Sequence, residues 1–335
     1  MSEILVPEDP LVRFQDLYTA LNADRSWFQS ADPLRFAAIA AMCIPGQAVE
    51  VAKSIRQIGD RIKAESGMFG AMRSDLRFIV AAILLSRGDT ADGLMGEVRR
   101  VRALFRARSM RRAEAYETMA ILMLRMKADQ APVSDDALDR FKAMYEEMKL
   151  HHWWLTGPED FPACAVLSGQ DADIDEIGAR TEAIYQALIT VGFAAGDPLQ
   201  TAANLLYLAS GQPHDIAQRY HALAEGFKLA GVSIWRSDYD ELAILSFLHH
   251  SARQIIETVL ARRAVIEALK PKPSRELTFN LASSVAFLEL VKVDEQMHTI
   301  TDARALMDIQ AIIQAQQAAA AAGAAAASAA SAGGS

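Results

Sequence analysis

The feature that most constrains this chain is a motif that returns about every 40 residues. In most copies an acidic residue precedes a short apolar run, and a longer amphipathic segment follows. The clearest pairs of copies are Asp32-Pro33-Leu34 with Asp197-Pro198-Leu199, and Asp160-Phe161 with Asp238-Tyr239. An internal repeat of this length predicts one supersecondary unit per copy.

The longer segment of each copy has the periodicity of an α-helix. Its apolar residues recur at spacings of three, four or seven, as in Val51, Ile55, Ile58 and Ile62. That spacing places them on one helix face. No segment alternates with period two over the length of a strand. The sequence therefore predicts an all-α protein of tandem helical hairpins.

The spacing of the copies favours a particular arrangement of these hairpins. The units start near Asp32, Asp75, Glu114, Asp160, Asp197, Asp238 and Arg275. The period is close to that of HEAT-type units. We expect residues 1–312 to form an α-solenoid-like, HEAT-like stack; the alternative is a globular bundle with decayed repeats. The Ala/Ser/Gly-rich tail, 313–335, has no large apolar residue to bury, so we expect it to be frayed or disordered.

Local signals at the helix ends agree with these units. Aspartate at a helix start can accept hydrogen bonds from free N–H groups of the first turn, and its charge suits the helix dipole. We therefore expect the repeated aspartates to be N-caps. Gly67, Gly192 and Gly231 follow long segments, where a left-handed C-cap is expected.

Charge and hydropathy narrow the classes of partner. The net charge is −8, which disfavours binding to nucleic-acid phosphates. No apolar stretch approaches the roughly 20 residues of a membrane span, and the N-terminus does not resemble a signal peptide. We expect a cytoplasmic protein without membrane insertion. Cys43 and Cys164 lie in apolar segments and are expected to be buried thiols.

The motifs that suggest chemistry have simpler explanations. Asp171-x-Asp173-x-Asp175 imitates a calcium loop, but Glu176 stands where that loop needs glycine. The adjacent pairs His151-His152 and His249-His250 point about 100° apart on a helix, so they cannot readily share a metal. The serines that end the short segments recur, which indicates a structural need: Ser86, Ser168, Ser210 and Ser246. We predict no catalytic residue, no metal ligand and no cofactor.

Two regions remain as candidate binding surfaces. Arg99, Arg102 and Arg106 form a helical stripe, which is either a solvated face paired with acids or a docking patch for an acidic or phosphate-bearing partner. The second region is a corner that contains His151, His152, Trp153 and Asp160. It is either a packed contact between repeats or a recognition pocket.

The block from Met148 to Gln200 resembles a bacterial family catalogued as domain of unknown function 4003. The residues that carry the resemblance are His152, Leu155-Thr156-Gly157, Glu159-Asp160-Phe161-Pro162, Gly192-Phe193 and Gly196-Asp197-x-Leu199-Gln200. Phe161 departs from the tyrosine expected there. The resemblance implies a bacterial, cytosolic protein and supplies no activity, ligand or site residue.

The fold suggests two hypotheses for the function. A stack of hairpins presents an extended surface of the kind that binds proteins or peptides, so the first is an interaction or scaffold protein with an unknown partner. The alternative is an enzyme or small-ligand-binding protein whose site lies between repeats near His151–Asp160. The sequence does not decide whether the chain is an enzyme, although it favours a non-catalytic role.

Overall fold

The computed structural model describes residues 6–26, 29–67, 70–152 and 156–291. Over these residues the chain is helical and contains no strand, which confirms the all-α prediction. Three 3-10 helices, η1 to η3, span Ala71–Arg73, Pro158–Asp160 and Arg236–Asp238. The α-helices are α1 Pro10–Ala23, α2 Asp32–Ala40, α3 Ala48–Glu65, α4 Leu76–Arg87, α5 Ala91–Ala107, α6 Ala115–Lys127, α7 Asp135–His152, α8 Phe161–Ser168, α9 Ile174–Thr190, α10 Asp197–Leu206, α11 Pro213–Leu229, α12 Tyr239–Leu245, α13 Ala252–Ile266 and α14 Arg275–Val291.

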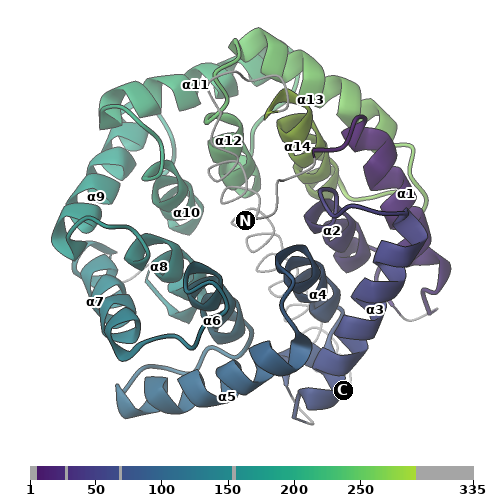
Figure 1. Cartoon of the computed structure of the whole chain (residues 1–335). Helices are drawn as coiled ribbons and strands as arrows, with labels where there is room; N and C mark the ends of the chain where they lie inside the picture. The colour runs from purple at the N-terminus through teal and green to yellow at the C-terminus, as the bar shows by residue number, and fades with distance from the viewer. Residues whose placement is uncertain (1–5, 27–28, 68–69, 153–155, 292–335) are drawn as a thin grey trace, which may run out of the picture.

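The helices alternate between two layers (Figure 1). Odd-numbered helices form the outer layer and even-numbered helices the inner layer. Each of the seven unit starts lies at, or one residue before, the first residue of an inner helix. The inner helices are buried around most of their circumference: all seven residues of α12 are buried, Asp240 and Glu241 among them. An outer helix such as α3 buries one stripe, which includes Val51, Ile55 and Ile62.

The two ends of the series of hairpins meet. Helix α1 packs against α3 and also against α14, while α14 packs against both α12 and α2. At this junction Arg35 of α2 is 1% exposed; it donates to Asp32 at 2.6 Å and to the carbonyl oxygen of Pro271 just before α14. The stack of hairpins therefore closes into a ring (Figure 1).

Arginines of the outer helices tie neighbouring hairpins together. Arg13 of α1 donates to the carbonyl oxygens of Ile44 and Gly46, which follow α2. Arg140 of α7 donates in the same way to the segment that follows α8, and Arg180 of α9 to the segment that follows α10. The last carbonyls of a helix lack partners within the helix. A guanidinium from the preceding outer helix satisfies carbonyls at and just beyond this end.

The helix starts differ in part from the expected N-caps. Asp9 does cap α1, by accepting from the backbone N–H of Val12 at 3.0 Å. Asp32 and Asp197 instead occupy the first helical position, next to proline, where their charge suits the dipole but their side chains are not caps. Asp160 and Asp238 precede α8 and α12 without capping them by a side-chain hydrogen bond.

The prediction of a left-handed glycine after a long helix is confirmed at two of the three positions. Gly192 and Gly231 have φ values of +104° and +82°, in the left-handed region that glycine favours. Gly67 does not adopt this conformation. Helix α3 ends at Glu65, two residues before its glycine, as α9 and α11 do. Here the backbone of Ser66 is extended instead, and its hydroxyl donates to the carbonyl of Ile62 at 2.7 Å.

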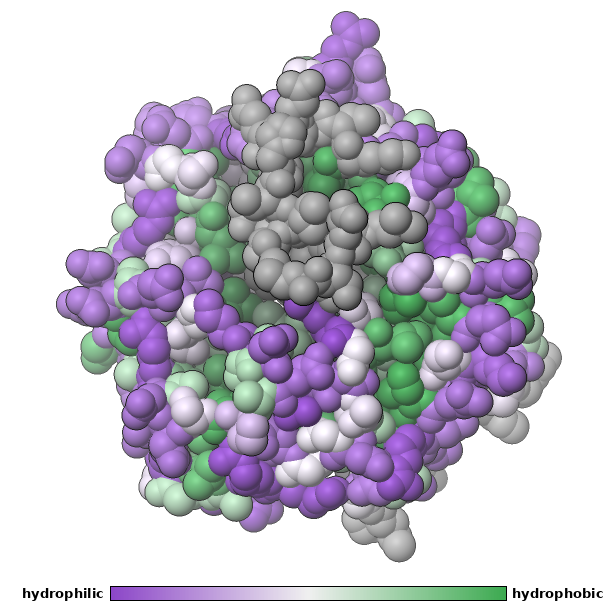
Figure 2. Space-filling view, in the orientation of Figure 1, coloured by the Kyte–Doolittle hydropathy of each residue, from purple (hydrophilic) through white to green (hydrophobic). Residues whose placement is uncertain are grey.

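Polar residues dominate the rim of the face shown in Figure 2, and hydrophobic residues gather nearer its centre. Across the described part of the chain, no helix combines the length and hydropathy required to cross a membrane. The expected tail, 313–335, lies outside the described residues, as does Trp153.

Candidate functional site

The arginine stripe lies on the outer helix α5 and is engaged in ion pairs. The guanidinium of Arg99 lies 3.1 Å from the carboxylate of Glu65 on α3, and Arg99 itself is 60% exposed. Arg102 and Arg106 both contact Glu117 of α6, which is 2% exposed. Arg102 also donates to the backbone carbonyl of Glu114 at 2.7 Å.

These contacts give the three arginines different roles. Glu117 is a buried carboxylate, and two guanidinium groups offset the cost of removing its charge from water. Arg102 and Arg106 therefore fasten α5 to α6. Arg99 is the most exposed of the three, and its ion pair with Glu65 joins α5 to α3.

The corner around His151 is only partly described. His151 lies in the last turn of α7, and its Nε2 lies 3.2 Å from the carboxylate of Glu147. His152 is the last residue of the helix, but its side chain lies outside the described residues. Asp160 lies beyond the segment that connects α7 to η2 and is the last residue of η2.

Asp160 is held by a turn that recurs elsewhere in the ring. Its carboxylate accepts from the backbone N–H of Gly157 at 2.9 Å, and Asp238 accepts from the N–H of Trp235 at 2.8 Å. Burial raises the pKa of the Asp160 carboxyl to about 7, partly opposed by this hydrogen bond. Because the same turn precedes both α8 and α12, it performs a repeated structural task at both places.

The recurring serines also have a repeated structural role. The hydroxyl groups of Ser86, Ser168 and Ser246 each donate to the backbone carbonyl three residues earlier. Their bonds help to close the last turn of an inner helix, as the recurrence predicted for these three. Ser210 differs, because it lies four residues beyond the end of α10. Within the described ranges, no group of three His, Cys, Asp or Glu side chains is arranged to hold a metal ion.

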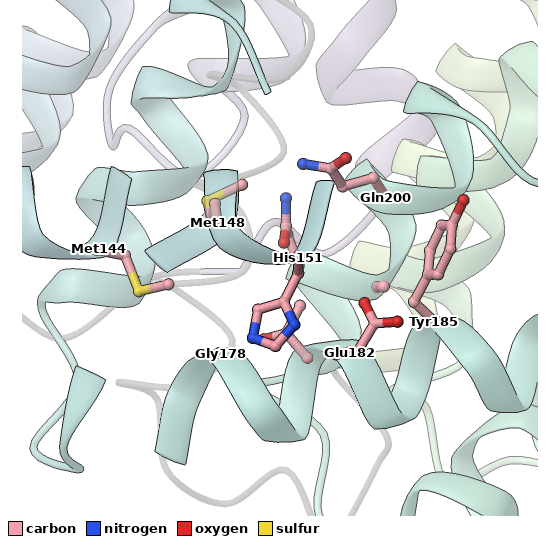
Figure 3. Close-up of a pocket in the computed structure, with 10 residues that line it drawn as sticks. Met144, Met148, His151, Gly178, Glu182, Tyr185 and Gln200 are labelled. Carbon is pink, nitrogen blue, oxygen red and sulfur yellow. The ribbon is translucent and has the colours of Figure 1, made fainter. Parts of the chain in front are cut away.

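A pocket lies between α7, α9 and α10, beside His151. It is small: the cavity that a water molecule can enter measures about 20 Å³, which is room for about one water molecule. The close-up in Figure 3 shows side chains from these three helices converging on it. Its lining is Met144, Met148, His151, Gly178, Thr181, Glu182, Tyr185, Gln200, Ala203 and Asn204.

Helical spacing places these residues on one face of each helix. Helix α7 supplies positions 144, 148 and 151, α9 supplies 178, 181, 182 and 185, and α10 supplies 200, 203 and 204. Gly178 lets α7 and α9 approach closely, since a Cβ atom there would lie 2.6 Å from Cγ of Glu147. The pocket walls are therefore fixed by helix packing and not by loops.

The buried part of the pocket carries two carboxamides. Gln200 and Asn204 lie one turn apart on α10 and are 3% and 4% exposed. The Gln200 Nε2 atom donates to the hydroxyl of Thr156 at 3.4 Å, but its Oε1 atom has no hydrogen-bond partner among the described residues. Neither side-chain atom of Asn204 has one. Native proteins leave few buried polar atoms in this state.

A different buried polar cluster lies between α12 and α14. Asn280 donates to the carboxylate of Glu241, and Arg275 lies 3.1 Å from the carboxylate of Asp238. Burial raises the pKa of Glu241 well above its usual range, and the neighbouring Asp240 carboxylate raises it further. Here the polar groups satisfy one another, in contrast to the carboxamides of α10.

The structure brings one sequence-predicted residue, His151, into the pocket and leaves Asp160 out of its lining. Asn204 was missed. Its signal is weak: a single amide within the apolar run of α10, four residues after Gln200. Gln200 was noted only as part of the family resemblance.

Comparisons with known proteins identify relatives but no activity. A family model described as protein of unknown function, DUF4003, matches residues 17–318. An uncharacterised protein of Bacillus subtilis (strain 168), YeaA, is 24% identical over 313 residues, which cover 90% of each chain. No solved structure matches.

Proposed function

We propose that this chain, which belongs to the DUF4003 family, binds a small molecule in the pocket between α7, α9 and α10. The observation that carries the proposal is the carboxamide of Asn204, buried at the pocket with no partner for its donor or its acceptor among the residues that the structure describes. An unpartnered buried amide costs roughly 1–3 kcal/mol of stability. A ligand that supplies the missing hydrogen bonds offsets this cost.

The surroundings of the amide also suit a binding site. Pockets that bind small molecules are mostly apolar and have a few fixed polar groups, and here Met144, Met148 and Ala203 surround the two carboxamides. The hydroxyl of Thr181 donates to the carbonyl of Ile177 at 2.8 Å within its own helix. This hydroxyl is therefore held within its helix and is not placed to act as a nucleophile. We accordingly propose binding and not catalysis.

Ligand-observed NMR with a mixture of small fragments tests this proposal. We expect saturation transfer from the native chain to a subset of the fragments, and loss of that transfer in Thr181→Phe, which fills the half-buried edge of the pocket. Thr190→Phe is the matched control, because Thr190 is on the same helix, makes the same bond to the carbonyl four residues earlier, and is exposed. Equal transfer to both variants would contradict the proposal.

The second candidate is the docking of an acidic partner at the outer face of α5. One observation favours it: Arg99 is largely exposed, and Arg111 and Arg112 are exposed beyond the end of the same helix. The test compares pull-downs from native lysate with Arg99→Glu and with the native chain. Loss of a specific protein from the variant's pull-down would support this candidate. Identical partner lists would remove it.

We also propose a cytosolic location. Cys164 is a buried thiol that forms no disulfide, and cysteines outside disulfides are typical of a reducing compartment. Fractionation of the native organism would test the location.

A further inference from the structure

The ring has two edges, one where the inner helices start and one where they end. The starts lie together: Gln29, just before α2, donates to the carboxylate of Asp75, just before α4, at 3.2 Å. The short helices η2 and η3, which precede α8 and α12, also contact neighbouring inner helices. The ends meet in the same way, since Gln130, after α6, donates to the carbonyl oxygen of Arg87, the last residue of α4. We call these the start edge and the end edge.

The end edge is acidic. The connection from α8 to α9 and the first turn of α9 carry four exposed carboxylates that form no ion pair with a described residue: Asp171, Asp173, Asp175 and Glu176. The connection from α6 to α7 adds Asp129, and α7 begins with Asp135 and Asp136, all three exposed. Neither connection contains a lysine or an arginine, and one exposed cation, Lys127, ends α6.

The connection from α5 to α6 gives the start edge a patch of the opposite charge. Arg111 and Arg112 are both exposed there and form no ion pair with a described residue. Glu114 is the one acid of this connection. Elsewhere the start edge carries both signs, as in the exposed Lys272 and Glu276 beside the start of α14. The charges of the two arginines are therefore available to an acidic partner.

Both edges also expose apolar side chains. Five large hydrophobic residues of the described chain are exposed, each near the end of an outer helix: Val12, Val49, Leu150, Leu229 and Trp235. The two valines lie in the first turns of α1 and α3, at the end edge. The other three lie in the last turn of α7, at the end of α11 and in the connection after α11, toward the start edge. A contact between the two edges would remove apolar surface from water on both of its sides.

We propose that a second copy of this chain docks on the start edge through its own end edge, so that the rings associate head to tail. The inference rests on the second candidate function, the docking of an acidic partner beside α5, and names that partner. A start-to-start contact would bring the arginines of one copy against those of the other, and an end-to-end contact would do the same with the carboxylates. Only the contact between different edges is complementary in charge, and such a heterologous contact can continue from copy to copy.

Sedimentation of the native chain at rising protein concentration tests self-association. The net charge of −8 favours separate chains, so association depends on the two charged patches and is sensitive to salt. The screening length is about 30 Å at about 0.01 M salt and about 3 Å at about 1 M. We expect the average mass to rise with concentration at low salt and to return toward that of the single chain at high salt. A chain that stays monomeric at every concentration in low salt would overturn the inference.

Charge-swap variants test which surfaces meet. The start-edge variant, Arg111→Glu with Arg112→Glu, and the end-edge variant, Asp171→Arg with Asp173→Arg, should each weaken self-association by about tenfold or more. The reason is that like charges then face each other across the contact. An equal mixture of the two variants should associate like the native chain, because each reversed edge then meets an edge of opposite charge. Loss in each variant without rescue in the mixture would overturn the head-to-tail contact.

The matched control is Lys53→Glu with Arg219→Glu. It changes the net charge as much as the start-edge variant does, but at exposed positions away from the ends of α3 and α11. The control should associate nearly as the native chain does, and a loss equal to that of the start-edge variant would overturn the inference. A monomeric chain that still captures an acidic protein through Arg99 would overturn the second copy as the partner and keep the second candidate function. Circular dichroism and the melting temperature of each variant show whether a loss reflects misfolding.

Discussion

Helices α10 and α14 each bury an asparagine in the inner layer, with opposite consequences. Asn204 of α10 and Asn280 of α14 are 4% and 3% exposed. Asn280 donates to Glu241 and stabilises the contact between α14 and α12. Asn204 faces a pocket, and within the described structure its side chain has no hydrogen bond. Burial alone therefore does not reveal the role of a polar side chain; its partners do.

The arginine stripe extends this comparison to charged groups. Arg102 and Arg106 resembled a docking surface in the sequence, yet both contact the buried carboxylate of Glu117. Their positive charge is offset by this carboxylate within the fold. Replacing both by glutamate would place carboxylates beside Glu117, so only Arg99 can be reversed without disturbing this contact.

The largest expected effect is at Glu117. Glu117→Gln leaves two guanidinium groups without their buried carboxylate, and removing one partner of a buried ion pair costs about 3–5 kcal/mol. Urea denaturation should show a loss of this order. The control is Glu257→Gln, whose exposed pair with Arg253 should contribute less than about 1 kcal/mol. Similar losses in both variants would show that the contact at Glu117 does not fasten the fold.

The same substitution should change the stability of the chain in opposite directions at the two asparagines. Asn280→Leu removes the amide that donates to the buried carboxyl of Glu241 and should destabilise the chain by about 1–3 kcal/mol. Asn204→Leu removes an unpartnered amide and should stabilise the ligand-free chain by about 1 kcal/mol. Thermal unfolding measures both. Destabilisation by Asn204→Leu would indicate that its amide already has a structural partner.

Asp160 should make stability depend on pH. Its pKa in the folded chain is about 7, above the ordinary value of 3.8. Between about pH 4 and pH 7 the folded state holds a proton that the unfolded state has released, so the free energy of unfolding decreases as the pH rises through this range.

Asp160→Asn should flatten that decrease and should be more stable than the native chain above pH 7. A fully buried carboxyl with this shift would contribute about 4 kcal/mol, but Asp160 is partly exposed, so we expect about 1 kcal/mol. Asp171→Asn, at an exposed position, controls for the loss of one negative charge. If the free energy of unfolding of Asp160→Asn decreases with pH as steeply as that of the native chain, Asp160 is not the source of the pH dependence.

The smallest effect on stability is expected at Arg99. Because its pair with Glu65 is largely exposed, Arg99→Glu should change the free energy of unfolding by no more than about 1 kcal/mol. The same variant can therefore test docking in a pull-down without loss of fold, with Arg253→Glu as an exposed control on α13.

Local patterns in the sequence determined the helices and their order. Apolar spacing distinguished long helices with one buried stripe from short helices buried on most sides, and the repeated starts marked the inner helices. These signals are local because a helix forms its backbone hydrogen bonds between residues four apart. Cap chemistry was less certain, since Asp32 or Asp197 can satisfy the helix dipole from the first turn without acting as a cap.

The tertiary structure decided which residues became partners. Closure of the ring depends on Arg35 meeting Pro271, which is 236 residues away, and the arginine stripe is neutralised by carboxylates from neighbouring helices. The pocket arises because three helices each turn one face toward the same space, and there the side chain of Asn204 has no hydrogen bond to any described residue. No periodicity encodes such a meeting, because it depends on how whole helices pack. The sequence determined the hairpins, and packing determined which side chains meet at the pocket.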